Sequence, residues 1–316
     1  MASYIIIDIN GLGYAAMYQP DLASLSCNGF QTSGIHGALF SVFSIMKKFK
    51  NHTPIIVWDG KSVWRNTIYP EYKSNRNNTP EKLSIKESYN KQVPIIKKIL
   101  WEAGIPQIMS LEAEADDIAG ELVRHKDDND NIVLVTSDSD WYQVIGDKVS
   151  LYHQSKKKIL TVDTFMVDTI DDGGFQSPKQ YITCKAISGD LQTDNIPGVN
   201  GIGLKTALKF IEEYDTLENI WQLKSSIEKI KSKKLIELVN NKELVERNLK
   251  LIDWSFAPKI KKLSLLCGAY QGDTFSNICL EYGLNGVFKT WVALTSTECM
   301  DSYIHDANNI FNKIDY

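Results

Sequence analysis

Acidic side chains in this 316-residue chain stand where a metal site could form. Four carboxylates come at the ends of apolar segments that predict buried strands: Asp8, Asp59, Asp138 and Asp140. Ligand sites of open parallel sheets form beyond the carboxyl ends of the strands. We therefore expect these four carboxylates to lie together at one edge of a sheet.

Five further acids extend this set. Three of them open a predicted helix and two lie downstream: Glu114, Asp116, Asp117, Asp190 and Asp194. A single acid at such a position is usually a helix cap or a turn former. Carboxylates that gather at one edge, however, repel one another unless cations neutralise them. Because the set is all oxygen, without His or Cys, it predicts two Mg²⁺ or Mn²⁺ ions and metal-assisted phosphoryl transfer.

A basic, aromatic segment runs from Lys61 to about Glu87. Its members with candidate roles are Arg65, Tyr72, Lys73 and Arg76. Cations mixed with aromatic rings are typical of surfaces that follow a nucleic-acid backbone and stack on unpaired bases. Since the segment leaves the predicted sheet beside Asp59, its cations would reach a phosphate held on the metal ions. The alternative is a solvated surface loop.

A glycine-rich segment follows further along the chain, with candidate ligand contacts at Gly198, Gly201, Gly203 and Lys205. It does not match a P-loop, because Leu204 separates the last glycine from Lys205 and no strand precedes it. Predicted helices at Pro178–Ser188 and Leu204–Tyr214 flank it, which favours a helix–hairpin–helix. Exposed N–H groups at the start of the second helix suit a DNA phosphate. A plain helix–helix connection is the alternative.

The order of the predicted elements favours an α/β fold with a parallel, doubly wound sheet. Strands are predicted at Tyr4–Ile9, Pro54–Trp58, Ile105–Met109, Asn131–Thr136 and Val149–His153. Helices are predicted between them at Ile35–Phe49, Val93–Ala103 and Ala113–Arg124. From about Pro178 onward helical patterns dominate. The turn-rich sequence at residues 171–174 predicts a domain boundary between residues 170 and 178.

The formal net charge of −4 is a sum of strongly charged blocks. Residues 47–98 hold 12 basic and 4 acidic side chains, residues 99–222 hold 10 and 22, and residues 223–262 hold 11 and 5. Basic surfaces around an acidic centre suit a polyanion held against metal ions, although solvated helix faces are the alternative. A hydrophobic content of 43% with 23% charged residues excludes a disordered or fibrous chain.

Cysteine usage and hydropathy indicate an intracellular protein. The five cysteines form no C-x-x-C pair, so we expect reduced thiols rather than disulfides or a zinc site: Cys27, Cys184, Cys267, Cys279 and Cys299. The N-terminus lacks the basic region of a signal peptide, and the apolar stretch at residues 35–46 is too short to span a bilayer. These features predict a cytoplasmic location and no membrane partner.

Taken together, six segments resemble, in order, the motifs of the 5′-nuclease (flap endonuclease) family, most closely its phage members and the 5′-nuclease domain of bacterial DNA polymerases. They are the strand ending at Asp8, then Val57–Asp59, Tyr72–Arg76, Glu114–Asp117, Thr136–Asp140 and Gly189–Gly203. The resemblance implies a PIN-like nuclease domain over residues 1–175 with a helical arch at about 61–95. It also implies a helix–three-turn–helix DNA-binding domain over 176–262 and a C-terminal helical extension over 263–316.

The resemblance implies a role for each candidate residue. The catalytic ion would be held, directly or through water, by Asp8, Asp59, Glu114, Asp116 and Asp117. The second ion would be held by Asp138, Asp140, Asp190 and Asp194. Lys73 and Arg76 match the arch cations that neutralise the scissile phosphate. Contacts to DNA would come from Arg65, Tyr72, Gly198, Gly201, Gly203 and Lys205, and the glycine hairpin would hold K⁺.

Two departures from the family pattern stand out. Relatives often have Asp-Gly-Ser/Thr at the first strand and an arginine seven residues after its Asp, whereas this chain has Asp8-Ile9-Asn10 and Ala15. Lys61 or Arg65 is expected to supply the missing phosphate contact. Relatives commonly space the last two acids three apart, whereas Asp190 and Asp194 are four apart, which weakens the assignment of Asp194.

These features predict a structure-selective 5′→3′ exonuclease or flap endonuclease of DNA replication or repair, located in the host cytoplasm if the chain is phage-encoded. Its expected partners are DNA with 5′ flaps or frayed 5′ ends, RNA–DNA primer junctions, and a replication protein at the C-terminus. The alternatives are a non-catalytic DNA-binding scaffold and a metal-dependent ribonuclease acting on RNA primers. The acid set argues against the scaffold, and the arch and hairpin argue against the ribonuclease.

Overall fold

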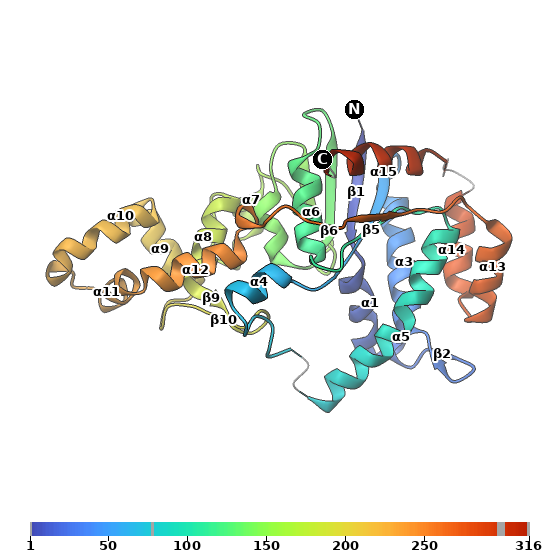
Figure 1. Cartoon of the computed structure of the whole chain (residues 1–316), viewed down its shortest axis with the longest axis horizontal. Helices are drawn as coiled ribbons and strands as arrows, with labels where there is room; N and C mark the ends of the chain where they lie inside the picture. The colour runs from blue at the N-terminus through green and yellow to red at the C-terminus, as the bar shows by residue number, and fades with distance from the viewer. Residues whose placement is uncertain (1, 77–78, 296–300, 315–316) are drawn as a thin grey trace.

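A seven-stranded sheet forms the centre of the α/β part of the chain (Figure 1). The structure is a computed structural model that describes residues 2–76, 79–295 and 301–314. The strand order is β11-β5-β4-β1-β6-β7-β8. The five inner strands are parallel: β1 (Ser3–Asp8), β4 (Thr53–Trp58), β5 (Gln107–Met109), β6 (Asn131–Thr136) and β7 (Val149–His153). The antiparallel edges are β8 (Lys158–Leu160) and β11 (Ser264–Leu266).

Helices cover both faces of this sheet. Ile6 of β1 packs into a core that includes α6 (Ala115–Arg124), while Ile5 and Ile7 pack on the opposite side against α3 (Ser33–Lys48). Because both faces are covered, Ile5, Ile6 and Ile7 are fully buried, which explains why the strand is continuously apolar. The predicted α/β fold with a parallel, doubly wound sheet is confirmed.

The basic segment after β4 is more helical than its sequence pattern indicates. It contains α4 (Val63–Ile68) and the first half of α5 (Pro80–Glu102), whose predicted start was Val93. The first half of α5 is mostly exposed and lacks an apolar face, and Pro94 lies inside the helix, where a proline normally marks a helix start. Figure 1 shows this half of α5 extending away from the sheet, directly after the thin grey trace.

A tight connection joins α8 (Pro178–Ser188) to α9 (Leu204–Tyr214) through the short strands β9 (Gly189–Asp190) and β10 (Ile196–Pro197). A Cβ atom on Gly198 would lie 2.0 Å from the carbonyl oxygen of Ser188, so only glycine fits there. Asn248 of α12 (Lys242–Ile252) donates to the backbone oxygens of Ala186 and Pro197, at 3.0 and 2.8 Å. The remaining elements of this helical part are α10 (Leu217–Gln222), η2 (Leu223–Lys229), α11 (Lys233–Asn240) and η3 (Trp254–Phe256).

After α12 the chain returns to the sheet. The segment expected to be a helical extension begins instead with the strand β11, which pairs with β5 over three residues and is too short to give a sequence pattern. It continues with α13 (Gly272–Glu281), α14 (Asn285–Thr295) and α15 (Asp301–Ile314). α13 contacts α5, α14 contacts α3, and α15 lies across β4 and α6. The C-terminal segment therefore completes the cover of both sheet faces.

The described cysteines carry free thiols: Cys27, Cys184, Cys267 and Cys279. Cys184 and Cys279 are buried and the other two are half-buried, while Cys299 lies outside the described residues. In the described part of the chain, no helix has both the length and the apolar character that crossing a membrane requires.

Candidate active site

Four acids gather where β1, β4 and β6 end and α6 begins. We call them the first carboxylate set: Asp8, Asp59, Asp116 and Asp138. Burial, together with repulsion from Asp59, raises the pKa of Asp8 to about 7. Burial and repulsion from Asp140 raise the pKa of Asp138 to about 6, and burial and repulsion from Asp138 raise the pKa of Asp116 well above its usual value. The set therefore holds negative charge that repels itself.

Neutral donors orient the first carboxylate set. Asp59 accepts from the backbone N–H of Ala115 at 2.9 Å and from Asn10 Nδ2 at 3.0 Å. Trp141 Nε1 donates to Asp116 at 2.8 Å. Each of these bonds uses one oxygen lone pair and brings no positive charge, so the oxygens keep the capacity to bind a cation.

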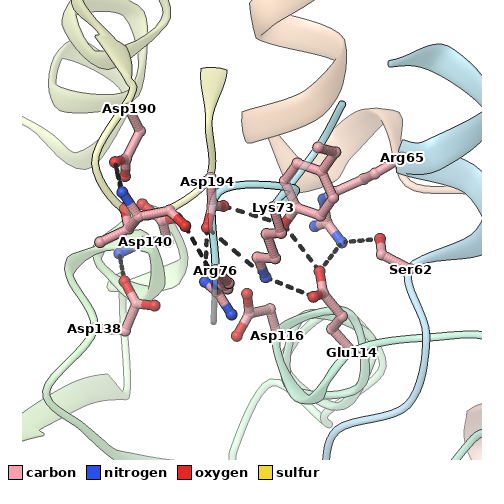
Figure 2. A network of polar contacts seen from close by, with 12 residues as sticks. Ser62, Arg65, Lys73, Arg76, Glu114, Asp116, Asp138, Asp140, Asp190 and Asp194 are labelled. Atoms are coloured by element: carbon pink, nitrogen blue, oxygen red, sulfur yellow. Dashed lines mark hydrogen bonds and ion pairs between the residues drawn. The ribbon is translucent and has the colours of Figure 1, made fainter. Parts of the chain in front are cut away.

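Cations from the basic segment enter the site beside this set (Figure 2). We call the group the Lys73 cluster: Tyr72, Lys73, Arg76, Glu114 and Asp194. Lys73 Nζ lies 2.5 Å from Glu114 Oε1 and 3.8 Å from Asp194 Oδ1, and Arg76 Nη2 lies 2.8 Å from Asp194 Oδ1. Although burial acts to raise it, pairing with Lys73 lowers the pKa of Glu114, whereas burial raises the pKa of Asp194. The predicted arch cations thus contact predicted metal ligands.

A second ammonium lies between two other predicted ligands. We call this group the Lys185 cluster: Lys185 of α8, Asp140 and Asp190. Lys185 Nζ makes a close ion pair with Asp140 Oδ1 and lies 2.9 Å from Asp190 Oδ2. Although burial acts to raise it, Lys185 lowers the pKa of Asp190. Of the predicted second-ion ligands, Asp140 and Asp190 thus pair with Lys185 and Asp194 pairs with Arg76 and Lys73, whereas Asp138 belongs to the first carboxylate set.

Arg65 is buried beneath the site, with 2% of its surface exposed. Its guanidinium lies 2.9 Å from Asp117 Oδ1 and 3.0 Å from Glu114 Oε2, and its Nε donates to the carbonyl oxygen of Leu251 at 3.0 Å. The prediction that Arg65 contacts DNA is wrong, because these acids and the α12 end hold it inside. Asp117 also accepts from the Glu114 backbone N–H at 3.0 Å, so its oxygens contact both the start of α6 and Arg65.

Tyr72 is likewise buried, with 5% of its surface exposed. Its hydroxyl lies 3.0 Å from Glu114 Oε2 and 3.1 Å from Asp194 Oδ2, while its ring packs in the core beneath α6. The prediction that Tyr72 contacts a base is wrong, because its ring offers no open face for stacking. It links the acids of α6 and of the α8–α9 connection instead.

A groove of about 850 Å³ opens beside the site, between α1 (Ile9–Tyr18) and the first half of α5. Its lining includes Tyr14, Tyr18, Arg76, Lys82 and Lys86. Aromatic rings and cations around an open channel suit a single-stranded nucleic acid. Cations mixed with aromatic rings were predicted for the basic segment with Tyr72 as the aromatic residue, whereas the groove has Tyr14 and Tyr18.

The hairpin residues lie on the α8–α9 connection. Gly201 adopts a φ of 72° with open space around it, and Gly203 immediately precedes the first turn of α9. Lys205 is exposed in that turn. Free N–H groups of a helix start next to an exposed lysine suit a phosphate. Gly198 has the packing role described above instead.

No three Asp, Glu, His or Cys side chains lie close enough to share a metal ion within the described residues. The donors of the first carboxylate set nevertheless fit a hard divalent cation, because all are carboxylate oxygens. Their mutual repulsion, which raises the pKa of Asp8 and Asp138, is what a bound cation would relieve.

Comparisons with known proteins decide the family. A family model described as the 5′-3′ exonuclease N-terminal resolvase-like domain matches residues 3–169, and one described as the 5′-3′ exonuclease C-terminal SAM fold matches residues 176–262. The chain belongs to the 5′–3′ exonuclease family. A 5′-3′ exonuclease of Buchnera aphidicola (subsp. Acyrthosiphon pisum) is 34% identical over 262 residues, which cover 78% of this chain and 84% of that relative.

Other members of the exonuclease family belong to larger proteins. DNA polymerase I of Bacillus subtilis is 30% identical over 235 residues, which cover 74% of this chain but 25% of the polymerase.

Among solved structures, the T5 D15 protein co-crystallized with metal ions has a TM-score of 0.62 at 25% identity, over 94% of this chain and 100% of that chain. Flap endonuclease-1 from Methanococcus jannaschii shares the fold, with a TM-score of 0.57 at 17% identity over 93% and 91% of the chains. This chain is thus a nuclease of the 5′–3′ exonuclease family.

Two residues of this exonuclease's site escaped the sequence analysis. Asn10, which departs from the family pattern, donates to Asp59 and accepts from the Tyr89 hydroxyl at 3.3 Å. Lys185 gave no sequence signal, because its partner Asp140 is 45 residues away and on another element.

Proposed function

We propose that this nuclease hydrolyses DNA phosphodiesters near 5′ ends and depends on divalent ions, with Mg²⁺ or Mn²⁺ as the cofactor. The observation that carries the proposal is the first carboxylate set, which holds self-repelling charge beside an open groove lined by cations. Metal ions in the T5 D15 crystals and the family's activity support it.

Two carboxylate groups would hold the ions. The first carboxylate set would hold one ion together with Glu114, and Asp140 and Asp190 would hold the second. A divalent ion bound there supplies a water of lowered pKa and positive charge beside the phosphate. Glu114, which pairs with Lys73 in this structure, would help to hold that ion, and the Lys73 ammonium would then be available to a phosphate.

Lys73 and Arg76 would bind the scissile phosphate. Both cations already point into the site, and both are neutralised there by carboxylates. Lys73 would bind an incoming phosphate oxygen, and Arg76, whose side chain is 48% exposed, would neutralise the phosphate from its place beside Asp194. Both cations would stabilise the charge that develops on the phosphate.

The rest of the molecule would select the substrate. We propose residues 61–95 as the arch beside which an unpaired 5′ strand passes, with Tyr14, Lys82 and Lys86 along its path.

The α8–α9 connection, within a DNA-binding unit over residues 176–262, would bind duplex DNA through Gly201, Lys205 and the start of α9, with K⁺ at the hairpin. Such an enzyme would trim 5′ flaps, frayed ends and RNA–DNA primer junctions in phage or cellular replication or repair, in the cytoplasm. The acidic segment after residue 262 would be its docking point for a replication protein.

Cleavage assays on matched substrates test this function. We expect Mg²⁺-dependent cutting of a 5′-flap DNA in preference to blunt duplex and single-stranded DNA, and no cutting by the variant Asp116→Asn. Cutting confined to the matched RNA would replace the proposal with the ribonuclease alternative. If none of the substrates is cut while flap DNA still binds, the chain is a non-catalytic DNA-binding relative.

A further inference from the structure

Lys185 is an internal cation in an otherwise acidic part of the active site. It comes from the last turn of α8, and 9% of its side chain is exposed. Its Nζ pairs closely with Asp140 Oδ1 and lies 2.9 Å from Asp190 Oδ2. An ammonium group in contact with two carboxylates stands where a hard cation bound to the same oxygens would stand.

The neighbouring acid does not complete a separate ion site. Asp194, four residues after Asp190, is turned away from Lys185, toward Arg76 at 2.8 Å and the Tyr72 hydroxyl at 3.1 Å. Asp140 and Asp190 are thus left as a pair that shares one protein cation.

The first carboxylate set contrasts with this pair. Among the described residues, none of its four members forms an ion pair with a lysine, arginine or histidine. Their hydrogen-bond donors are neutral, such as Asn10, Trp141 and the Ala115 N–H. A divalent ion can therefore enter the first set without displacing a protein cation, whereas an ion at Asp140 and Asp190 meets one.

We propose that the Lys185 ammonium is a resident cation of the second ion site, and that a second divalent ion binds only by displacing it. The inference rests on the proposed function, because it concerns the ions of that site. It follows that the two ions load unequally: the first set fills first, and the second site fills at higher ion concentration.

Mn²⁺ titration of the DNA-free full chain, followed by calorimetry and by electron paramagnetic resonance of free Mn²⁺, tests this. We expect one tight site and a second at least ~10-fold weaker, a difference of about 1.4 kcal/mol. The variant Lys185→Met should strengthen the second site by at least ~10-fold, since its two carboxylates lose their competing charge. Lys185→Arg should retain weak binding, and Lys179→Met, which removes an exposed lysine of the same helix, should match the wild type.

A second measurement uses the unmodified protein and so does not depend on how the variants fold. The buried Lys185 amine should resist an acylating reagent in metal-free protein, and it should become reactive, by peptide mass spectrometry, over the Mn²⁺ range that fills the second site. Two equal tight sites in the wild type, an unchanged second site in a folded Lys185→Met variant, or protection of Lys185 at saturation would each overturn the proposal. Because these readouts need no cleavage, they are separate from the nuclease assay, whose failure would overturn the proposed function and leave the ion-loading result standing.

Discussion

At the scale of single residues, the acids of the site differ in what balances their charge. Asp8 and Asp116 accept hydrogen bonds from neutral donors. Glu114 pairs with Lys73, and Asp194 pairs with Arg76. Asp140 and Asp190 share Lys185. A protein cation stabilises the charge of an ionised carboxylate in the absence of metal. A carboxylate without such a partner is therefore stabilised most by a bound metal ion. This division gives the residues different expected effects when they are changed.

Replacing Lys73 with alanine tests its place at the phosphate. We expect Lys73→Ala to lower the single-turnover cleavage rate of a 5′-flap DNA by ~10²–10³-fold, the usual cost of losing one group that stabilises transition-state charge. Binding of the same DNA in Ca²⁺ should weaken far less, because the groove and hairpin still hold it. As a comparison, Lys82→Ala removes a groove cation and should act mainly on binding. An unchanged single-turnover rate in Lys73→Ala would remove this residue from the mechanism.

The raised carboxyl pKa values predict how metal binding depends on pH. Since the pKa of Asp8 is about 7 and that of Asp138 about 6 in the metal-free protein, a divalent ion must compete with protons below pH 7. Mg²⁺ affinity should therefore fall as pH decreases from 7.5 to 5.5, by up to ~10-fold per pH unit for each proton displaced. Calorimetry in two buffers of different ionisation enthalpy would count the protons released.

The same shifts fix the sign of the effect on folding. A carboxyl whose pKa is raised binds more protons in the folded state than in the unfolded state between about pH 4 and pH 7, so its contribution to the free energy of unfolding decreases as pH rises through that range. Saturating Mg²⁺ should raise the melting temperature more at pH 7.5 than at pH 5.5. An equal rise at both values would show that these carboxyls are already ionised without metal.

At the scale of elements, buried strands were the easiest to predict and edge elements the hardest. The predicted ranges for β6 and β7 equal those observed, because inner parallel strands are apolar on both faces. β8 and β11 have three residues each and lie at sheet edges, where one paired side leaves little sequence pattern. The start of α5 escaped prediction for a related reason, since its exposed turns carry no periodic apolar face.

Two glycines of the α8–α9 connection give a matched test of that element. Gly198→Ala would place a Cβ 2.0 Å from the Ser188 carbonyl oxygen, whereas Gly203→Ala meets nothing within 4 Å. We expect Gly198→Ala to lower the free energy of unfolding by ~2–3 kcal/mol and to weaken duplex binding, and Gly203→Ala to change stability little. Urea denaturation with duplex-binding titrations would measure both. Equal stability of the two variants would contradict the packing role assigned to Gly198.

At the scale of the whole molecule, the sequence did not predict site contacts between residues that lie far apart in the chain. The topology of a parallel sheet brings strand ends together, so Asp8, Asp59 and Asp138 could be placed from sequence. Arg65 pairs with Asp117, 52 residues away, and reaches the end of α12, 186 residues away. Such contacts depend on how the helical part docks on the sheet, which no local pattern specifies. For that reason Arg65 and Tyr72 were expected to face DNA although they are buried.

The C-terminal segment should matter for the stability of the whole nuclease. Trp291 of α14 is fully buried, with its ring centroid 4.7 Å from that of Phe43 on α3 and 5.2 Å from that of Phe275 on α13. We expect Trp291→Ala to lower the free energy of unfolding by ~3–5 kcal/mol, because it empties the contact between this segment and the sheet-covering helix. Denaturant unfolding followed by circular dichroism would measure the loss.

Trp291→Phe is the matched control, since it keeps an aromatic ring and removes an indole N–H for which the described structure holds no hydrogen-bond partner. Trp291→Phe should lower the free energy of unfolding much less than Trp291→Ala, because a buried polar group without a partner contributes no stability of its own.

A chain shortened to residues 1–262 should lose the same contact entirely and also expose the edge of β5, so it should melt at a lower temperature and aggregate. If the shortened chain melts like the full chain, α13 and α14 are an appendage, and the core that joins Phe43 to Trp291 contributes little to the folding of the nuclease.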